Sequence, residues 1–600
     1  MKTNSDQTEI FCNLPRASET EFHLKTWGPG QNVYSKIEAL EGVFSTIPDR
    51  FMDFLDIATF VYCGDQAIPR SQGITDTHDT HWYRGLHFNI GVRDVVFWQT
   101  PEVSQKLVEV LSFLSGECIS FDFKKLEQER SRNNYFDFVG KWDENEKPDQ
   151  VMLFSGGLDS LGGAIFEAID NKRRLVLVRH RPANKFNSVF NRLDKQLEEK
   201  CPYRPLFINL EINKDKTLTR DYTQRTRSFL YFSLAATAAF LLGTDNVKFY
   251  ENGPVSINLP LLDQVIGSQS TRTTHPRVLR GYQELATLIA GRQFTVENPF
   301  IFKTKAEVID IIVKRECESF IPNSISCAHA NFGHRSLAKP QCGACSQCID
   351  RRFAFETRGW SQYDPVDHYC TDFFNGGIYS AIKKEEDQAT LVGYVDRALK
   401  IAQMDFQSFV ANYPQITRAA KYLAPNTAAA AQNLFDLYKR HAEEIKKVCC
   451  ELITKNQEAL MLGTLPSDAL PRLVIDNPAY IAQQYQPLPP PPYLERIEEK
   501  GIEIWKVNGE AKKLQYKSNS IQHIILMALY QYYITAPNAW IPHKVLMIAT
   551  GWKSKERYFG KGNGDNGLML KRLYDLRKAL GINIRFEKEN GCRIEIPVKS

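Results

Sequence analysis

No apolar run in the sequence is long enough to cross a bilayer. The longest, Phe229 to Leu242, is interrupted by Ser and Thr and is shorter than the roughly 20 apolar residues that a membrane helix requires. The segment that follows Met1 also lacks the apolar core of a secretion signal. We therefore expect a cytoplasmic protein that does not enter membranes, with Phe229 to Leu242 as a buried helix.

The chain also has little excess charge of either sign. It contains 75 Lys and Arg against 70 Asp and Glu, a formal net charge of +5, and 43% of its residues are hydrophobic. That composition is typical of a globular protein, and the length predicts about three or four folded units. The 13 cysteines occur without a secretion signal, so most of them should be buried thiols rather than disulfides.

A glycine-rich turn follows the apolar run Val151 to Phe154. The next six residues, 155–160, are Ser-Gly-Gly-Leu-Asp-Ser, and they lack the Gly-Lys-Ser/Thr ending of a Walker loop. Glycines let the backbone approach a ligand closely, and the N–H groups at the start of the following helix attract anions. We expect Asp159 to cap the helix and to position Mg²⁺. The expected phosphate cradle consists of Ser155, Gly156, Gly157, Leu158 and Ser160.

Four cysteines lie close together later in the chain. Cys342, Cys345 and Cys348 follow a C-x-x-C-x-x-C pattern, and Cys327 precedes them. Four thiolates suit a closed tetrahedral Zn²⁺ site, which is structural rather than catalytic. An iron–sulfur cluster and uncoordinated thiols are the alternatives.

These two motifs together resemble those of the QueC family, the 7-cyano-7-deazaguanine synthases. The resemblance extends from about Gln150 to Phe355 and includes Arg227 before an apolar helix, Lys305 at a helix start and Arg351 after the last cysteine. It implies an α/β fold whose core is a parallel-sheet PP-loop domain, similar to the adenine nucleotide alpha hydrolases, with a zinc-binding tail.

The resemblance also implies a reaction. QueC enzymes use ATP to adenylate the carboxylate of 7-carboxy-7-deazaguanine, let ammonia form an amide, and dehydrate the amide to a nitrile in a second ATP-dependent round. Attack on the α-phosphate builds negative charge, so the site needs N–H groups, Mg²⁺ and cations rather than a protein nucleophile. The predicted catalytic residues are Asp159, Arg227 and Lys305, although the two cations could instead form surface ion pairs. The predicted cofactors are ATP, Mg²⁺ and Zn²⁺.

Polar residues follow two more apolar runs. Glu251 and Asn252 come after Phe249 and Tyr250, and His180 follows a run that ends at Val178. Open α/β sheets bind ligands at the carboxyl ends of their strands. Glu251, Asn252 and His180 are therefore predicted to line the nucleotide and substrate pocket, with ordinary polar turns as the alternative.

The rest of the chain predicts accessory regions. The predicted segments are an α+β accessory domain (1–148), the QueC-like domain (149–355), a helical region (356–485), a Pro-rich linker (486–500) and a winged-helix-like domain (501–600). In the first, Leu86 to Val92 and Val95 to Trp98 are expected to be strands and Pro101 to Ser115 a helix. In the last, hairpins are expected at both ends with three helices between them, at 519–533, 543–549 and 567–580.

The C-terminal segment is more basic than the rest. Residues 501–600 contain 17 Lys and Arg against 8 Asp and Glu, a net charge of +9, which leaves −4 for the remainder of a chain whose total is +5. A basic winged helix can contact nucleic acid, and winged helices also dock proteins. Both partners remain open.

A QueC-like core with added ends is similar to the long QueC-like proteins of bacterial anti-phage operons, of the type IV CBASS and Qat kinds. That likeness implies an antiviral role in which the amine that accepts the activated carboxylate could be ammonia or an amine of a partner protein, such as an operon partner. The alternatives are a nitrile-forming synthase of queuosine biosynthesis and a nucleotide sensor with an inactive PP-loop.

Overall fold

The computed structural model contains two compact units, Met1–Asn477 and Pro478–Ser600. Among the described helices, none has the length and apolar character that a membrane crossing demands. The structure describes residues 7–16, 18, 21–35, 47–69, 84–127, 147–180, 186–220, 225–260, 272–328, 336–376, 385–466, 469–475, 494–499, 502–507, 510–512, 583–587 and 591–595.

The first unit contains a five-stranded parallel sheet in the order β11-β10-β6-β7-β8. Its central strand, β6, is buried throughout. A parallel sheet covered on both faces needs apolar side chains on both sides of each strand, which explains the unbroken apolar run before the glycine turn. The strands are β6 (Gln150–Leu153), β7 (Leu175–His180), β8 (Leu206–Leu210), β10 (Asn246–Lys248) and β11 (Thr295–Glu297).

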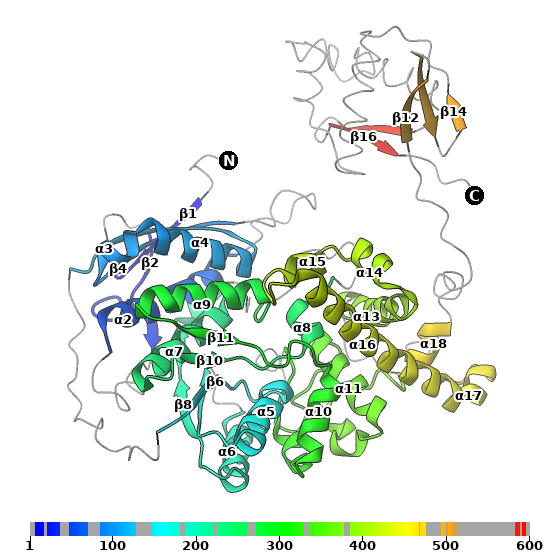
Figure 1. Ribbon diagram of the computed structural model, residues 1–600, viewed down its shortest axis with the longest axis horizontal. Helices are drawn as coiled ribbons and strands as arrows, with labels where there is room; N and C mark the ends of the chain where they lie inside the picture. Colours follow the sequence, from blue (N-terminus) through cyan, green and yellow to red (C-terminus); the bar gives the residue numbers. More distant parts are fainter. Residues whose placement is uncertain are drawn as a thin grey trace. The chain divides into compact units, whose positions relative to one another are not determined.

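Successive residues of β6 enter different cores because strand side chains alternate between faces. Val151 and Leu153 join a core that includes α7 and α9, whereas Met152 and Phe154 join one that includes α5 and α10. Figure 1 shows these helices around the sheet. They are α7 (Arg227–Leu242), α9 (Pro276–Ala290), α5 (Leu158–Ile165, continued by the π-helix η3, Phe166–Asp170), α6 (Asn187–Lys200), α10 (Lys305–Lys314) and α11 (Ser346–Arg358).

The N-terminal region forms a second sheet, in the order β2-β1-β4-β5, and all of its strands are parallel. Helices connect β1 to β4 and β4 to β5, so the arrangement is α/β and not the α+β domain that the sequence predicted. The elements are β1 (Gln7–Cys12), β2 (Phe22–Leu24), α2 (Asp49–Ala67), β4 (Gly85–Val92), α3 (Val95–Gln99), α4 (Pro101–Ser115) and β5 (Cys118–Lys125).

The predicted strand at Leu86 to Val92 and the predicted helix at Pro101 to Ser115 are confirmed by β4 and α4. The predicted strand at Val95 to Trp98 is wrong, because these residues form the short helix α3. Asp94 precedes them, and its carboxylate accepts a hydrogen bond from the Phe97 N–H at 3.1 Å. A capped first turn of this kind outweighs the strand preference of two valines.

The two sheets share one hydrophobic core. Ile10 and Phe88 of the N-terminal sheet belong to the same buried cluster as Phe232 and Tyr282 of α7 and α9. Phe54 of α2 contacts Phe232 edge to face, with ring centroids 5.8 Å apart. The core therefore continues across the expected boundary at residue 148. A small antiparallel pair, β3 (Val33–Ser35) with β9 (Ile212–Lys214), links the same two regions.

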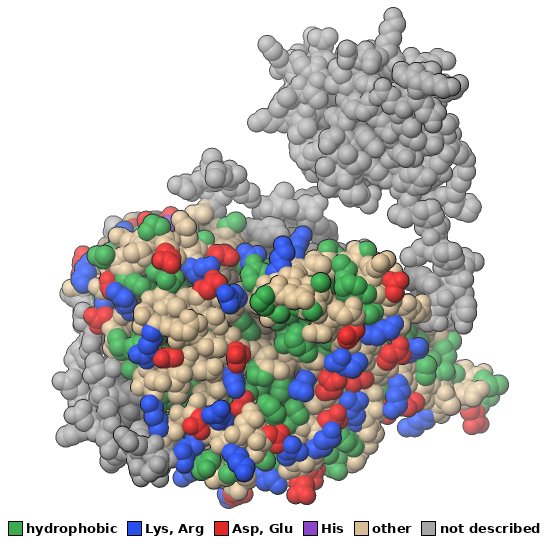
Figure 2. Space-filling view, in the orientation of Figure 1, with side chains coloured by type: hydrophobic (Ala, Val, Ile, Leu, Met, Phe, Trp, Pro, Cys, Tyr) green, Lys and Arg blue, Asp and Glu red, His purple; other side chains and the backbone are tan. Residues whose placement is uncertain are grey.

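The predicted helical region is helical in its described part. The longest helix of this region, α16, packs against α11 and α13 and also against α8. On the face of the molecule seen in Figure 2, basic and acidic side chains are interspersed. The helices of this region are α13 (Glu385–Gln403), α14 (Phe406–Asn412), α15 (Gln415–Ala420), α16 (Thr427–Lys455), α17 (Gln457–Met461) and α18 (Leu470–Ile475), with 3-10 turns η8 (Ser361–Tyr363) and η9 (Val366–His368). The short helix α8 (Gly253–Ile257) and the 3-10 turns η5 (Lys216–Leu218) and η7 (Glu318–Asn323) lie earlier in the chain.

The second unit contains antiparallel strands. β12 (Leu494–Glu499), β13 (Ile502–Val507) and β14 (Glu510–Lys512) form one sheet, and β15 (Asn583–Glu587) pairs with β16 (Gly591–Glu595). Both expected hairpins are present. The predicted linker 486–500 is wrong in its second half, where β12 lies. The polyproline run and the three expected helices lie outside the described residues, so the winged helix stays a prediction.

Candidate functional site

The glycine turn lies at the carboxyl end of β6, where α5 begins. Gly156 has a φ of +78°, and a Cβ on it would lie 2.6 Å from Cε1 of Phe190. Only glycine readily adopts this positive φ and also leaves room for the Phe190 ring. Gly157 is the N-cap residue of α5, so the Asp159 cap that the sequence predicted is wrong. Asp159 lies instead in the first turn, and its carboxylate faces the interior.

Serine hydroxyl groups accept hydrogen bonds from the backbone N–H groups at the N-terminus of α5. The Gly157 N–H donates to Ser155 Oγ at 3.3 Å, and the Leu158 N–H donates to Ser326 Oγ at the same distance. Ser155 Oγ and Ser160 Oγ are 3.1 Å apart. Long hydrogen bonds to neutral hydroxyls are easily exchanged for bonds to a charged acceptor. The N–H groups at this end of the helix can therefore bind phosphate oxygens.

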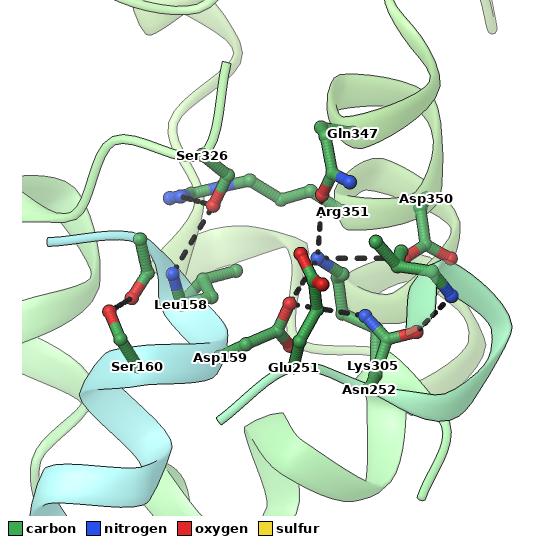
Figure 3. A network of polar contacts seen from close by, with 12 residues as sticks. Leu158, Asp159, Ser160, Glu251, Asn252, Lys305, Ser326, Gln347, Asp350 and Arg351 are labelled. Carbon is green, nitrogen blue, oxygen red and sulfur yellow. Dashed lines mark hydrogen bonds and ion pairs between the residues drawn. The ribbon is translucent and has the colours of Figure 1, made fainter. Parts of the chain in front are cut away.

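Lys305 is the cation of the site. Its Nζ lies 2.9 Å from Asp159 Oδ2, 3.2 Å from Gln347 Oε1 and 3.5 Å from an oxygen of Asp350 (Figure 3). Its side chain is only 1% exposed. Burial alone would lower the pKa of Lys305, but the two carboxylates outweigh burial and raise it. Lys305 is therefore a fixed positive charge.

The backbone holds Lys305 in place as well. Lys305 is the first residue of α10, directly after the N-cap Thr304. Thr304 Oγ1 accepts from the Glu307 N–H at 3.3 Å, and the Glu307 carboxylate accepts from the Thr304 N–H at 2.9 Å. This capping box fixes the first turn of the helix, and with it the direction in which Lys305 leaves the backbone.

Asn252 and Glu251 approach the same place from the segment after β10 (Figure 3). Asn252 Nδ2 donates to Asp159 Oδ2 at 3.1 Å, and its Oδ1 caps α8. The Glu251 carboxylate accepts a hydrogen bond from Thr274. Burial raises the pKa of Glu251 to about 7, and the neighbouring Asp159 charge adds to that rise. Near neutral pH, Glu251 can therefore release or accept a proton.

Two predicted site residues lie elsewhere or are incompletely described. Arg227 begins α7, where it donates a hydrogen bond to the Tyr231 hydroxyl and interacts with Tyr62 of α2. The structure thus places it beside tyrosines rather than beside the Asp159 carboxylate. His180 ends β7, paired with Leu210 of β8, and its side chain lies outside the described residues.

Sequence reasoning missed three contributors, namely Ser326, Gln347 and Asp350. Their position next to the cysteines could have indicated them. Ser326 directly precedes Cys327, and Gln347 and Asp350 lie three residues apart on one face of α11, on either side of Cys348. Arg351 fastens this tail to the glycine turn. It donates to Ser326 Oγ at 3.3 Å and to the buried Asp364 carboxylate at 2.8 Å.

The four cysteines converge in a buried cluster. The sulfurs of Cys327, Cys342, Cys345 and Cys348 all lie within 4.8 Å of one another. The N–H groups of Ala344 and Cys345 donate to Cys342 Sγ at 3.3 and 3.2 Å, which stabilises a thiolate there. Four sulfurs with supporting N–H donors fit a structural Zn²⁺ ion.

Asp159 also has the chemistry of a Mg²⁺ ligand. Its Oδ1 is buried and has no hydrogen-bond partner among the described residues, while its Oδ2 is engaged by Lys305 and Asn252. A buried carboxylate oxygen without a donor has an open ligand position, and carboxylate oxygens are ligands that Mg²⁺ prefers. Asp159 Oδ1 therefore fits the ion that accompanies a nucleoside triphosphate.

A glycine turn at the end of a central parallel strand, with a four-cysteine tail beside it, fits the PP-loop architecture predicted from the sequence. Residues 274–359 match the family model described as queuosine biosynthesis protein QueC. The match includes Lys305 and all four cysteines, and it supports the QueC-like character of this part of the chain. No curated protein matches the chain.

Proposed function

We propose that this protein adenylates a 7-deazaguanine carboxylate with ATP and then forms an amide from it. The observation that carries the proposal is the buried Lys305 ammonium, which lies 2.9 Å from Asp159. Asp159 is in the first turn of α5, within the phosphate cradle. The QueC-like match of residues 274–359 supports 7-deazaguanine-related chemistry. The likeness to the long QueC-like proteins of anti-phage operons extends the proposal to a role in anti-phage defence.

In the proposed reaction, a carboxylate oxygen of the substrate attacks the α-phosphorus of ATP. The bond to the bridging oxygen breaks and pyrophosphate leaves, which gives an acyl-adenylate. The N–H groups of Gly157 and Leu158 bind phosphate oxygens, and Lys305 stabilises the charge that develops on them. Mg²⁺, which Asp159 would hold, neutralises part of the triphosphate charge when bound.

An amine then attacks the acyl carbon of the adenylate. The carbon–oxygen bond to AMP breaks, AMP leaves, and the nitrogen loses a proton as the amide forms. Glu251, with a pKa of about 7, is the group that accepts this proton. Both ammonia and a lysine or terminal amine of a partner protein satisfy this step.

The test is incubation with Mg-ATP and 7-carboxy-7-deazaguanine, with and without ammonium, followed by mass spectrometry of AMP and the base products. AMP with amide but no nitrile supports the proposal, and a protein acceptor would then be sought. Nitrile formation would instead assign the biosynthetic synthase. Absence of AMP from zinc-loaded protein would refute the adenylation and favour a nucleotide sensor.

A further inference from the structure

A chain of buried polar groups leads from Lys305 into the helical region. Asp350 on α11 lies 3.5 Å from Lys305 Nζ through one carboxylate oxygen, and its other oxygen accepts from the Tyr394 hydroxyl at 2.6 Å. That hydroxyl is 3.2 Å from Nε2 of His441. Tyr394 lies on α13 and His441 on α16, so three helices contribute one member each.

All four residues of this hydrogen-bonded network are buried. Lys305 is 1% exposed, Asp350 3%, Tyr394 4% and His441 5%. Burying polar groups in a helix interface costs free energy even when they are hydrogen-bonded, whereas apolar side chains of similar size would pack there at no such cost. The placement of these groups directly behind Lys305 points to a role at the site rather than in stability.

The hydrogen bonds have one consistent direction. Tyr394 has a single proton and donates it to the Asp350 carboxylate, so its oxygen is free to accept from His441 Nε2–H. Burial lowers the pKa of His441 to about 4, which keeps the imidazole neutral with one N–H to give. The sequence of donors therefore runs from His441 through Tyr394 to Asp350, and the last carboxylate oxygen faces the ammonium.

We propose that Asp350, Tyr394 and His441 are positioning residues that hold the Lys305 ammonium for the phosphoryl transfer. The role rests on the proposed function. Lys305 has a carboxylate on each side. Asp159 belongs to the turn where phosphates bind, so the phosphates of a bound nucleotide compete with the Asp159 carboxylate for Lys305. Asp350 lies on the tail side and keeps its contact, and Tyr394 and His441 fix its rotamer.

The helical region thereby becomes part of the active site rather than an appended module. Its two buried polar side chains are separated from Lys305 in sequence by about ninety residues or more, and their described hydrogen bonds lead to it through Asp350. Among the described residues around Lys305, Gln347 supplies a further neutral acceptor at 3.2 Å, so the ammonium remains hydrogen-bonded when one carboxylate is drawn away.

The test compares Tyr394→Phe with Tyr282→Phe in the full chain. Tyr282 is equally buried and its hydroxyl contacts Ser228 at 3.0 Å in the other core, so it controls for the loss of a buried hydroxyl. Tyr394→Phe is expected to lower kcat for AMP release about tenfold, with the KM for ATP within about twofold of the parent, because a misplaced cation affects the transition state. Tyr282→Phe should alter neither constant.

Two more variants separate positioning from packing. His441→Gln retains an N–H donor and should keep most of the activity, whereas His441→Leu should lower kcat as Tyr394→Phe does. In a Lys305→Met background, Tyr394→Phe should have no further effect on the residual rate. Equal fold-losses with and without Lys305 would overturn the proposal, and so would full activity of His441→Leu.

Failure of the proposed function is distinguishable from failure of this inference. If the parent protein releases no AMP, the proposed reaction is wrong. The coupling between Tyr394 and Lys305 is then tested by thermal unfolding of Lys305→Met, Tyr394→Phe and the double variant. Non-additive shifts in Tm support the chain from Tyr394 to Lys305. Strictly additive shifts contradict it.

Discussion

At the scale of single residues, Lys305 and its two carboxylates determine both stability and chemistry. Lys305→Met leaves Asp159 and Asp350 buried around an apolar side chain, which should cost about 3–5 kcal/mol in the free energy of unfolding. The rate of AMP release should fall by on the order of 10²–10³-fold. Denaturant unfolding and steady-state kinetics measure the two effects.

Lys303→Met is the matched control for Lys305→Met, because Lys303 lies two residues away at the partly exposed end of the preceding turn. It makes the same chemical change without touching Asp159. A loss of activity in Lys303→Met equal to that of Lys305→Met would contradict the assigned role of the buried ammonium.

Glu251 gives stability a pH dependence. Its folded pKa of about 7 lies above the ordinary value of 4.5, so the folded state holds a proton that the unfolded state has lost between these pH values. Stability therefore falls as pH rises from about 4.5 to 7, by about 3 kcal/mol in total, and is constant above that range for this group. Glu251→Gln should remove this slope.

The measurement is the unfolding free energy of parent and Glu251→Gln at several pH values between 5 and 8. Glu444, whose pKa burial also raises to about 7, contributes a second slope of the same sign that Glu251→Gln leaves intact. If the two proteins had parallel pH profiles, the buried carboxyl would not be the titrating group.

Gly156 combines positive φ with close contact, and the two effects can be measured separately. Gly156→Ala should destabilise the protein by about 1–2 kcal/mol from φ alone, with a further loss from the contact with Phe190. Gly291→Ala is the control, since Gly291 has a φ of +66° and no atom within 4 Å of an added Cβ. Thermal unfolding of both variants separates the two effects, and equal losses would mean that Phe190 moves freely.

At the scale of elements, the four-cysteine cluster fixes α11, which carries Gln347, Asp350 and Arg351. Removal of Zn²⁺ by a chelator, or Cys345→Ser, should release this helix and abolish AMP release, since a structural zinc contributes on the order of 10 kcal/mol. Cys450→Ser, at an exposed cysteine of α16, should change nothing. Metal analysis should give one zinc per parent chain and none in Cys345→Ser, and an active zinc-free protein would contradict the assignment.

Local patterns allowed several elements to be predicted. The apolar run of β6, the glycine turn, the helix α4 and the hairpin with an Asn-Gly turn each have signals within a few residues. The α3 helix was missed because one capping aspartate outweighs two valines, and β12 because its charged residues resemble a linker. Parallel pairing of β1 with β4 depends on contacts between residues about 80 positions apart, which no local pattern encodes.

The part of the site that has local sequence signals was also predictable. Asp159, Glu251, Asn252 and Lys305 follow strands or begin helices, so their meeting at one edge of the sheet could be expected. Tyr394 and His441 lie on amphipathic helices whose pattern only indicates burial. Nothing in that pattern shows that a polar side chain on a buried face will contact Asp350.

At the scale of the whole molecule, the division at residues 477 and 478 predicts what can be removed. Residues 1–477 alone should fold cooperatively and release AMP at about the parent rate, because the described contacts of the site lie within them. Residues 149–477 should not fold, since they would expose the faces of α7 and α9 that pack against α2 and α4. Size-exclusion chromatography and thermal unfolding distinguish the two outcomes, and a stable 149–477 fragment would show that the cores are independent.

The core shared by the two sheets also constrains how the protein is made. A ribosome releases β1, β4 and β5 long before it has synthesised α9, whose side chains complete the same core. At about 5–20 residues per second, the interval between Lys125 and Ala290 lasts roughly 10 to 30 seconds. Until α9 is synthesised, the apolar faces of α4 and α7 that pack against it stay uncovered. The yield of the protein in a cell should therefore depend on chaperones that shield newly made segments until the later helices emerge.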